Sequence, residues 1–118
     1  MSELTPLFFT DAQSWNNWLA ENHQRATEAW VLHYKTKSHN MGLRYLEALR
    51  VAISFGWIES YLKSIDEEKF IRRYSPIKAN SAWSKRDQEE AKDLMRSGKM
   101  TEDGLRAVKS AKKNGRWK

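Results

Sequence analysis

The feature that most constrains the fold is a pair of strand-like runs separated by a short polar turn. The runs are Trp57–Ser64 and Lys69–Ser75, and both contain isoleucine and several aromatic residues, which favour strands. Residues 65–68 can reverse the chain between them. Pro76 ends the second run because proline has no amide hydrogen for a strand ladder. The sequence therefore predicts a β-hairpin.

Two elements are predicted before this hairpin. Thr10 and the glutamine three residues later have the spacing of a capping box, which predicts a helix from Asp11 to about Asn22 or His23. Residues 28–35 combine tryptophan, valine, leucine and tyrosine in a run too short for a typical helix, which indicates a strand. The polar residues 35–42 that follow are typical of a loop.

Three further helices are predicted. Residues 45–55 are apolar except at three positions on one narrow stripe, so we expect a helix buried on most sides that stops at Gly56. Helix-start patterns predict the other two at 84–98 and 101–115. Gly104 weakens the last helix locally because glycine has a poor helix propensity.

These elements predict an α+β fold in which a small antiparallel sheet packs against about four helices. The sheet is expected to have three or so strands, including the central hairpin. A chain of 118 residues has the length for one hydrophobic core, so we expect a single domain over residues 1–118.

Composition excludes several kinds of site. The chain has no cysteine, so disulfides and thiolate sites are absent. Its three histidines, His23, His33 and His39, lack the spacing of metal ligands, so we expect surface or boundary positions for them, and no metal or cofactor. No run of eighteen apolar residues could span a membrane. The N-terminus does not resemble a secretory signal, and we therefore expect a cytoplasmic location.

The positive charge is concentrated in the second half of the chain. The net charge is +6, and residues 61–118 carry sixteen basic and nine acidic side chains. Four basic residues of the last helix have the spacing of one stripe, namely Arg106, Lys109, Lys113 and Arg116. Such a stripe can contact phosphates, which makes nonspecific nucleic-acid binding an alternative function. The other interpretation is an ordinary solvated helix face.

A candidate ligand site lies along the hairpin. Counting inward from the turn places Glu59 near Arg72 or Arg73, with the register open by one residue. A carboxylate beside arginines and aromatic walls is typical of a pocket for a small polar ligand, whereas a salt bridge on a half-exposed sheet is the alternative. The candidate ligand-binding residues are Trp57, Glu59, Tyr61, Arg72, Arg73 and Trp83. No second titratable group accompanies Glu59, so no catalytic residue is assigned, and an enzyme is only a third hypothesis.

Three motifs resemble those of a known family. They are FGWIES at 55–60, SPIKANSAWS at 75–84 and SGKMTEDGLRAVKSAKKNGRW at 97–117. In this order they are similar to the YdeI/OmpD-associated family, also called bacteriocin-protection proteins. This chain has Glu59 where the family usually has aspartate, and Ile77 where it usually has arginine.

The resemblance implies a small α+β domain associated with resistance to antimicrobial peptides or bacteriocins, and it implies no known reaction. We therefore expect a cytoplasmic stress or bacteriocin-protection protein. Its partner is expected to be a small polar or anionic ligand, or another protein, bound on the hairpin face at 57–83.

Overall fold

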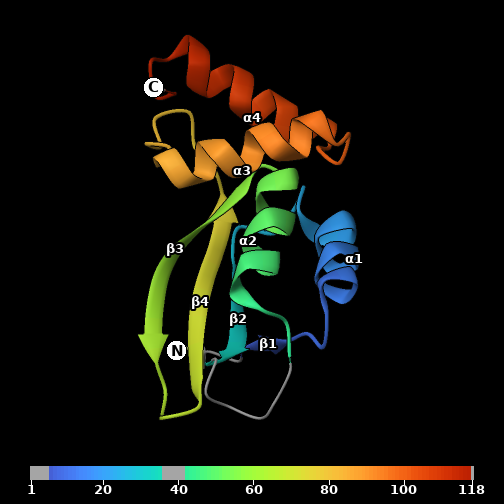
Figure 1. The fold of residues 1–118 in the computed structure, drawn as a ribbon, viewed down its shortest axis with the longest axis vertical. Coiled ribbons are helices and arrows are strands. Elements are labelled where there is room, and N and C mark those ends of the chain that lie inside the picture. The colour runs from blue at the N-terminus through green and yellow to red at the C-terminus, as the bar shows by residue number, and fades with distance from the viewer. Residues whose placement is uncertain (1–5, 36–41, 118) are drawn as a thin grey trace.

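The computed structural model describes residues 6–35 and 42–117, which form four helices and a four-stranded sheet (Figure 1). In chain order the elements are β1 (Leu7–Phe8), α1 (Ala12–Asn22), β2 (Ala29–Tyr34), α2 (Tyr45–Ser54), β3 (Trp57–Ser64), β4 (Lys69–Pro76), α3 (Lys85–Arg96) and α4 (Glu102–Lys113). The predicted α+β class is confirmed. Residues 36–41 of the predicted loop, His39 among them, lie outside the described residues.

The sheet is mixed rather than wholly antiparallel. Its strand order is β1-β2-β4-β3, and β4 runs antiparallel to both of its neighbours. The additional strand, β1, runs parallel to β2. A strand of two residues leaves no periodic signal in a sequence, which is why the sequence predicts only three or so strands. The predicted hairpin is formed by β3 and β4.

Helix α1 has a different N-cap from the one predicted. Asp11 is the cap, and its carboxylate accepts hydrogen bonds from the amide and the hydroxyl of Ser14, both at 2.8 Å. The expectation that Thr10 caps the helix is therefore wrong. An aspartate in this position accepts hydrogen bonds from the free amides of the first turn. It also places a negative charge at the positive end of the helix dipole.

Helix α2 connects two groups of buried side chains. The sheet cluster consists of Trp15, Leu19, Ala29, Val31, Leu43, Ala48, Ala52, Phe55, Trp57 and Tyr74. The helix cluster consists of Leu49, Ile53, Trp83, Ala91, Leu94, Val108 and Ala111. Helices α3 and α4 lie across the end of the sheet where β3 begins and β4 ends (Figure 1).

The end of α2 is the point at which the hairpin and α4 meet. Gly56 follows α2 with φ of +77°, a conformation that glycine adopts readily. Its carbonyl oxygen accepts a 2.8 Å hydrogen bond from the amide of Ile77, which follows β4. The Thr101 hydroxyl, at the start of α4, donates to the carbonyl oxygen of Ser54 at 2.6 Å. Three distant segments of the chain are thereby held together.

Candidate functional site

The hairpin register determines which arginine meets Glu59. A β-bulge lies between Glu59 and Tyr61, so that Glu59 pairs with Tyr74 and Tyr61 pairs with Arg73. Residues two apart on a strand share a face, and Glu59 therefore lies on the same face as Arg72. The Arg72 Nη1 atom donates to Glu59 Oε2 at 2.8 Å.

This ion pair is enclosed by its own neighbours. The Tyr45 hydroxyl donates to Glu59 Oε1 at 3.3 Å, and burial together with the Glu59 carboxylate raises the pKa of that hydroxyl. The Arg72 guanidinium lies 4.0 Å from the centre of the Tyr45 ring, and that of Arg86 lies 5.2 Å from it. Arg72 and Tyr45 thus hold the Glu59 carboxylate without an added ligand, as in the salt-bridge alternative, although the buried Nε atom of Arg72 has no hydrogen-bond partner.

The other candidate residues of the hairpin lie elsewhere. Arg73 is on the opposite face of β4, where its Nε atom donates to Glu28 Oε1 at 2.7 Å. Tyr61 is on that face too, with its ring 5.6 Å from the Trp30 ring in an edge-to-face arrangement. The structure therefore divides the four polar or exposed hairpin residues into two pairs on opposite faces, Glu59 with Arg72 and Tyr61 with Arg73.

The two candidate tryptophans are both buried, but in different places. Trp57 belongs to the sheet cluster and packs edge-to-face on Trp18, with 6.2 Å between the ring centres. Trp83 belongs to the helix cluster and packs on Trp117 at 5.1 Å between ring centres. Their positions indicate packing, and only the first lies beside the cavity described next.

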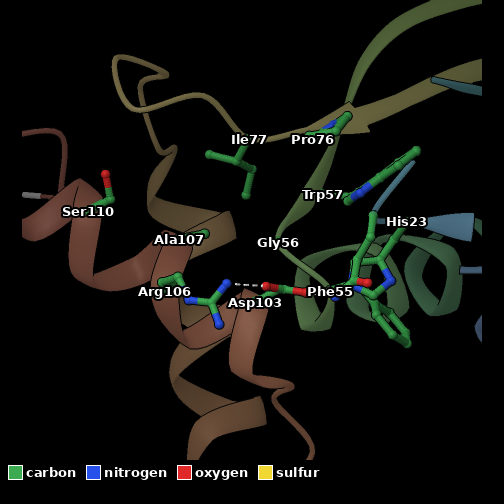
Figure 2. Close-up of a pocket in the computed structure, with 11 residues that line it drawn as sticks. His23, Phe55, Gly56, Trp57, Pro76, Ile77, Asp103, Arg106, Ala107 and Ser110 are labelled. Atoms are coloured by element: carbon green, nitrogen blue, oxygen red, sulfur yellow. Dashed lines mark hydrogen bonds and ion pairs between the residues drawn. The ribbon is translucent and has the colours of Figure 1, made fainter. Parts of the chain in front are cut away.

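A cavity of about 610 Å³ lies between the start of β3, the end of β4 and α4 (Figure 2). Segments from the three family-like motifs supply most of its wall. The lining residues are His23, Gln24, Phe55, Gly56, Trp57, Pro76, Ile77, Asp103, Arg106, Ala107 and Ser110. It therefore combines Trp57 of the hairpin candidates with Arg106 of the basic stripe.

A charged cluster occupies one end of the cavity. Asp103 accepts hydrogen bonds from His23 Nε2 at 2.6 Å, from Arg106 Nη1 at 2.5 Å and from Gln24 Nε2 at 3.3 Å. The His23 bond above all, and then the Gln24 bond, hold the pKa of the Asp103 carboxyl below its ordinary value. The other ring nitrogen of His23 lies 2.7 Å from the carbonyl oxygen of Leu19.

This arrangement makes His23 a poor candidate for a general base. Both of its ring nitrogens already lie within hydrogen-bonding distance of oxygen atoms, the carbonyl oxygen of Leu19 and Asp103 Oδ2. Neither nitrogen is therefore free to contact a bound molecule. His23 instead joins the end of α1 to the first turn of α4.

The remaining groups of the cavity suit recognition of an anion. The Arg106 side chain is 71% exposed and uses one guanidinium nitrogen for Asp103, which leaves further donors available. Ser110 lies one turn along α4. Figure 2 shows Arg106 and Ile77 on opposite sides of the gap, so a cation faces an apolar wall.

The basic stripe is shorter than predicted. Arg106, Lys109 and Lys113 are exposed on α4. Arg116 does not continue the stripe because α4 ends at Lys113 and the chain turns at Gly115, whose φ is +72°. Trp117, the nearby aromatic side chain on which a nucleic-acid base could stack, already packs on Trp83, and its ring centre lies 5.3 Å from the Lys112 ammonium group and 6.0 Å from that of Lys92.

Sequence reasoning missed the partners of Asp103. His23 and Asp103 lie eighty positions apart, and no local pattern connects them. The burial of His33 was missed as well, because the sequence does not show which face of its strand packs against the rest of the protein. Within the described residues, no group of three acidic or histidine side chains could hold a metal ion, and no helix is long and apolar enough to cross a membrane.

Comparison with known proteins gives a family without an assigned activity. Residues 7–107 match the model of a family described as Domain of unknown function (DUF8412). No curated protein and no solved structure matches the chain. The matched segment runs from β1 into α4 and includes every cavity-lining residue except Ser110. The chain therefore belongs to the DUF8412 family.

Proposed function

We propose that this protein is a non-enzymatic binding module for a small anionic ligand, which occupies the cavity between the start of β3 and α4. The observation that carries the proposal is the exposed Arg106 guanidinium facing the apolar wall of Pro76 and Ile77. Ligand pockets commonly combine apolar walls with a few polar groups that orient the ligand. A carboxylate or phosphate on a small apolar group has the matching chemistry.

The cavity is a better candidate than the hairpin face as a whole. Both arginines pair with a carboxylate, but the Arg72 side chain is stacked on Tyr45 and only 18% exposed, whereas that of Arg106 is 71% exposed. Trp57 remains part of the proposed site because it lines the cavity. The carboxylate of Glu59 then has a structural role, holding β3 and β4 against α2.

The resemblance of the cavity-forming motifs to bacteriocin-protection proteins supports a biological role. We propose that ligand binding serves protection against bacteriocins or antimicrobial peptides in the cytoplasm. A strain that lacks the protein is expected to become more sensitive to such peptides, and the Arg106→Ala variant is expected not to restore resistance. Full restoration of resistance by that variant would show that resistance does not depend on ligand binding in the cavity.

Binding can be tested by a ¹H–¹⁵N NMR titration with benzoate and phenyl phosphate, with inorganic phosphate as the probe that lacks an apolar part. We expect both aromatic anions to shift the signals of Gly56, the Trp57 indole and Ala107. Inorganic phosphate is expected to bind more weakly because it cannot use the apolar wall. Signal shifts centred on Arg72 would instead place the ligand on the hairpin face and contradict binding in the cavity.

A matched pair of arginines provides the control. Arg106 and Arg96 are 71% and 77% exposed, and each pairs with an aspartate three positions earlier on its helix. Only Arg106 lines the cavity. Arg106→Ala is therefore expected to abolish the benzoate shifts, and Arg96→Ala to leave them unchanged. Equal responses in the two variants would contradict a site at Arg106.

Nonspecific nucleic-acid binding remains the alternative proposal. It is favoured by Lys109 and Lys113, which are exposed on α4. Their side-chain ammonium groups have no hydrogen-bonding or ion-pair partner among the described residues. The double variant Lys109→Gln/Lys113→Gln should then weaken binding of a fluorescent oligonucleotide, and affinity should fall steeply as salt is raised. Absence of binding at about 50 mM salt would rule this function out.

A further inference from the structure

Strand β3 forms a long and open edge of the sheet. It pairs with β4 on one side, and no described strand pairs with its other side. The strand has eight residues, whereas β1 at the opposite edge has two. Figure 1 shows no helix or strand beyond the outer side of β3. Such an edge presents unpaired amide and carbonyl groups that can bind another strand.

The half of β3 nearest the turn is exposed on both faces. Tyr61 and Leu62 point to opposite faces and are 51% and 47% exposed, and Ile65 in the turn is 48% exposed. They are three of the six large hydrophobic side chains that are exposed in the described part of the chain. The bulge lies before Tyr61, so pairing is regular from there to Ser64. An apolar edge of this kind is typical of a protein interface.

Charge indicates that the partner can be a second copy of the chain. The whole chain has a net charge of +6, and α4 carries four basic and two acidic side chains, so two copies repel each other at this helix. Strand β3 carries one acidic and one basic residue, Glu59 and Lys63, and is therefore neutral. It is an edge at which two copies can approach without facing like charges.

We infer that the protein forms a two-fold homodimer in which the β3 strands pair antiparallel about Leu62. In this register Leu62 meets the partner's Leu62, and Tyr61 meets the partner's Lys63 on the other face of the sheet. Opposed residues of antiparallel strands share a face, so the lysine ammonium group can lie over the tyrosine ring. Two four-stranded sheets then become one continuous sheet.

The rest of the fold is compatible with this pairing. Helices α3 and α4 lie at the end of the sheet where β3 begins (Figure 1), and Leu62 lies near the other end of the strand. An antiparallel arrangement about Leu62 therefore places the helices of the two copies at opposite ends of the dimer. The same surface is used by both copies, as a two-fold interface requires.

The oligomeric state tests the inference directly. Light scattering after size exclusion is expected to give about twice the 13.9 kDa mass of the chain. Leu62→Lys should return the mass to that of a monomer, because it places two like charges at the two-fold axis. Leu105→Lys is the control, since Leu105 is 41% exposed on α4, away from β3. A monomeric wild type at its highest soluble concentration would overturn the dimer, as would a dimeric Leu62→Lys variant.

A single-cysteine experiment tests the register even if Leu62→Lys fails to fold. The chain has no cysteine, so Leu62→Cys introduces only one thiol. Mild oxidation is expected to give a disulfide-linked dimer, because residues that oppose themselves across the axis lie close enough to be bridged. Leu105→Cys is expected to remain uncrosslinked. Equal crosslinking of the two variants would contradict pairing through β3.

Discussion

At the scale of single residues, His33 shows how far a side chain can differ from its expected environment. The expectation of a surface or boundary position is wrong, because His33 is buried in β2 beside the sheet cluster. Its Nδ1 atom lies 3.0 Å from the carbonyl oxygen of Leu43, and its Nε2 atom lies 3.0 Å from the Tyr74 hydroxyl. A neutral ring that donates from Nδ1 and accepts at Nε2 satisfies all these groups.

This arrangement predicts loss of stability in mild acid. Burial, and then the positive charge of Arg72, lower the pKa of His33 from its ordinary value of 6.5. Below pH 6.5 the unfolded chain therefore binds a proton that the folded protein does not. The free energy of unfolding should fall by up to about 1.4 kcal/mol per pH unit from there down to the lowered pKa.

Urea unfolding at a series of pH values measures this dependence. The control is His33→Gln, which keeps a donor and an acceptor but does not titrate. Its stability should change less between pH 6.5 and the lowered pKa than that of the wild type. Identical slopes in the two proteins would show that His33 is not responsible.

At the scale of elements, the bulge in β3 determines the chemistry of each sheet face. Tyr61 pairs with Arg73, so a regular ladder would place Glu59 opposite Ser75 and on the face of Arg73. The bulge shifts the register by one residue and turns the carboxylate toward Arg72 and α2 instead. The sequence narrows the partner of Glu59 to two arginines, and the bulge selects between them.

The close approach of α4 to α2 gives a prediction for Gly104. Helix propensity alone favours Gly104→Ala by about 1 kcal/mol. An added Cβ, however, would lie 2.5 Å from the Ser54 carbonyl oxygen and 2.8 Å from the Met100 Sδ atom. We therefore expect Gly104→Ala to lower the free energy of unfolding by about 1 to 3 kcal/mol.

Urea denaturation measures this effect, with Lys109→Ala as the control because Lys109 is exposed on the same helix. That variant should change stability by less than about 0.5 kcal/mol. A stabilised Gly104→Ala protein would mean that the two helices can move apart at little cost.

At the scale of the whole molecule, α2 couples the two hydrophobic clusters. Ala48 and Ala52 belong to the sheet cluster, whereas Leu49 and Ile53 of the same helix belong to the helix cluster. If α2 separates from one cluster, it also leaves the other, and apolar side chains of both clusters become exposed. The structure therefore predicts cooperative unfolding.

Leu49→Ala tests this coupling. Leu49 is fully buried, so its truncation should cost about 2 to 5 kcal/mol. Hydrogen exchange should show equal losses of protection at Val31 in the sheet cluster and at Val108 in the helix cluster. A loss confined to Val108 would show that α3 and α4 unfold separately from the sheet.

Local patterns in the sequence determine the elements of this protein. Alternating apolar residues define β2 and the hairpin, and helical spacing with N-cap residues such as Ser84 and Thr101 defines α3 and α4. Glycines at 56, 98 and 115 mark the ends of three helices, each with a positive φ. These signals act within a few residues, which is why the α+β class follows from them.

Only the tertiary structure decides which of these elements meet and which side chains face one another. The parallel pairing of β1, the contact of His23 with Asp103 and the orientation of Glu59 depend on packing between distant segments or on a single bulge. A shift of one residue in a strand exchanges its faces. The cavity at Arg106 is therefore built from segments that are distant in the sequence, although the motifs that supply most of them can be recognised there.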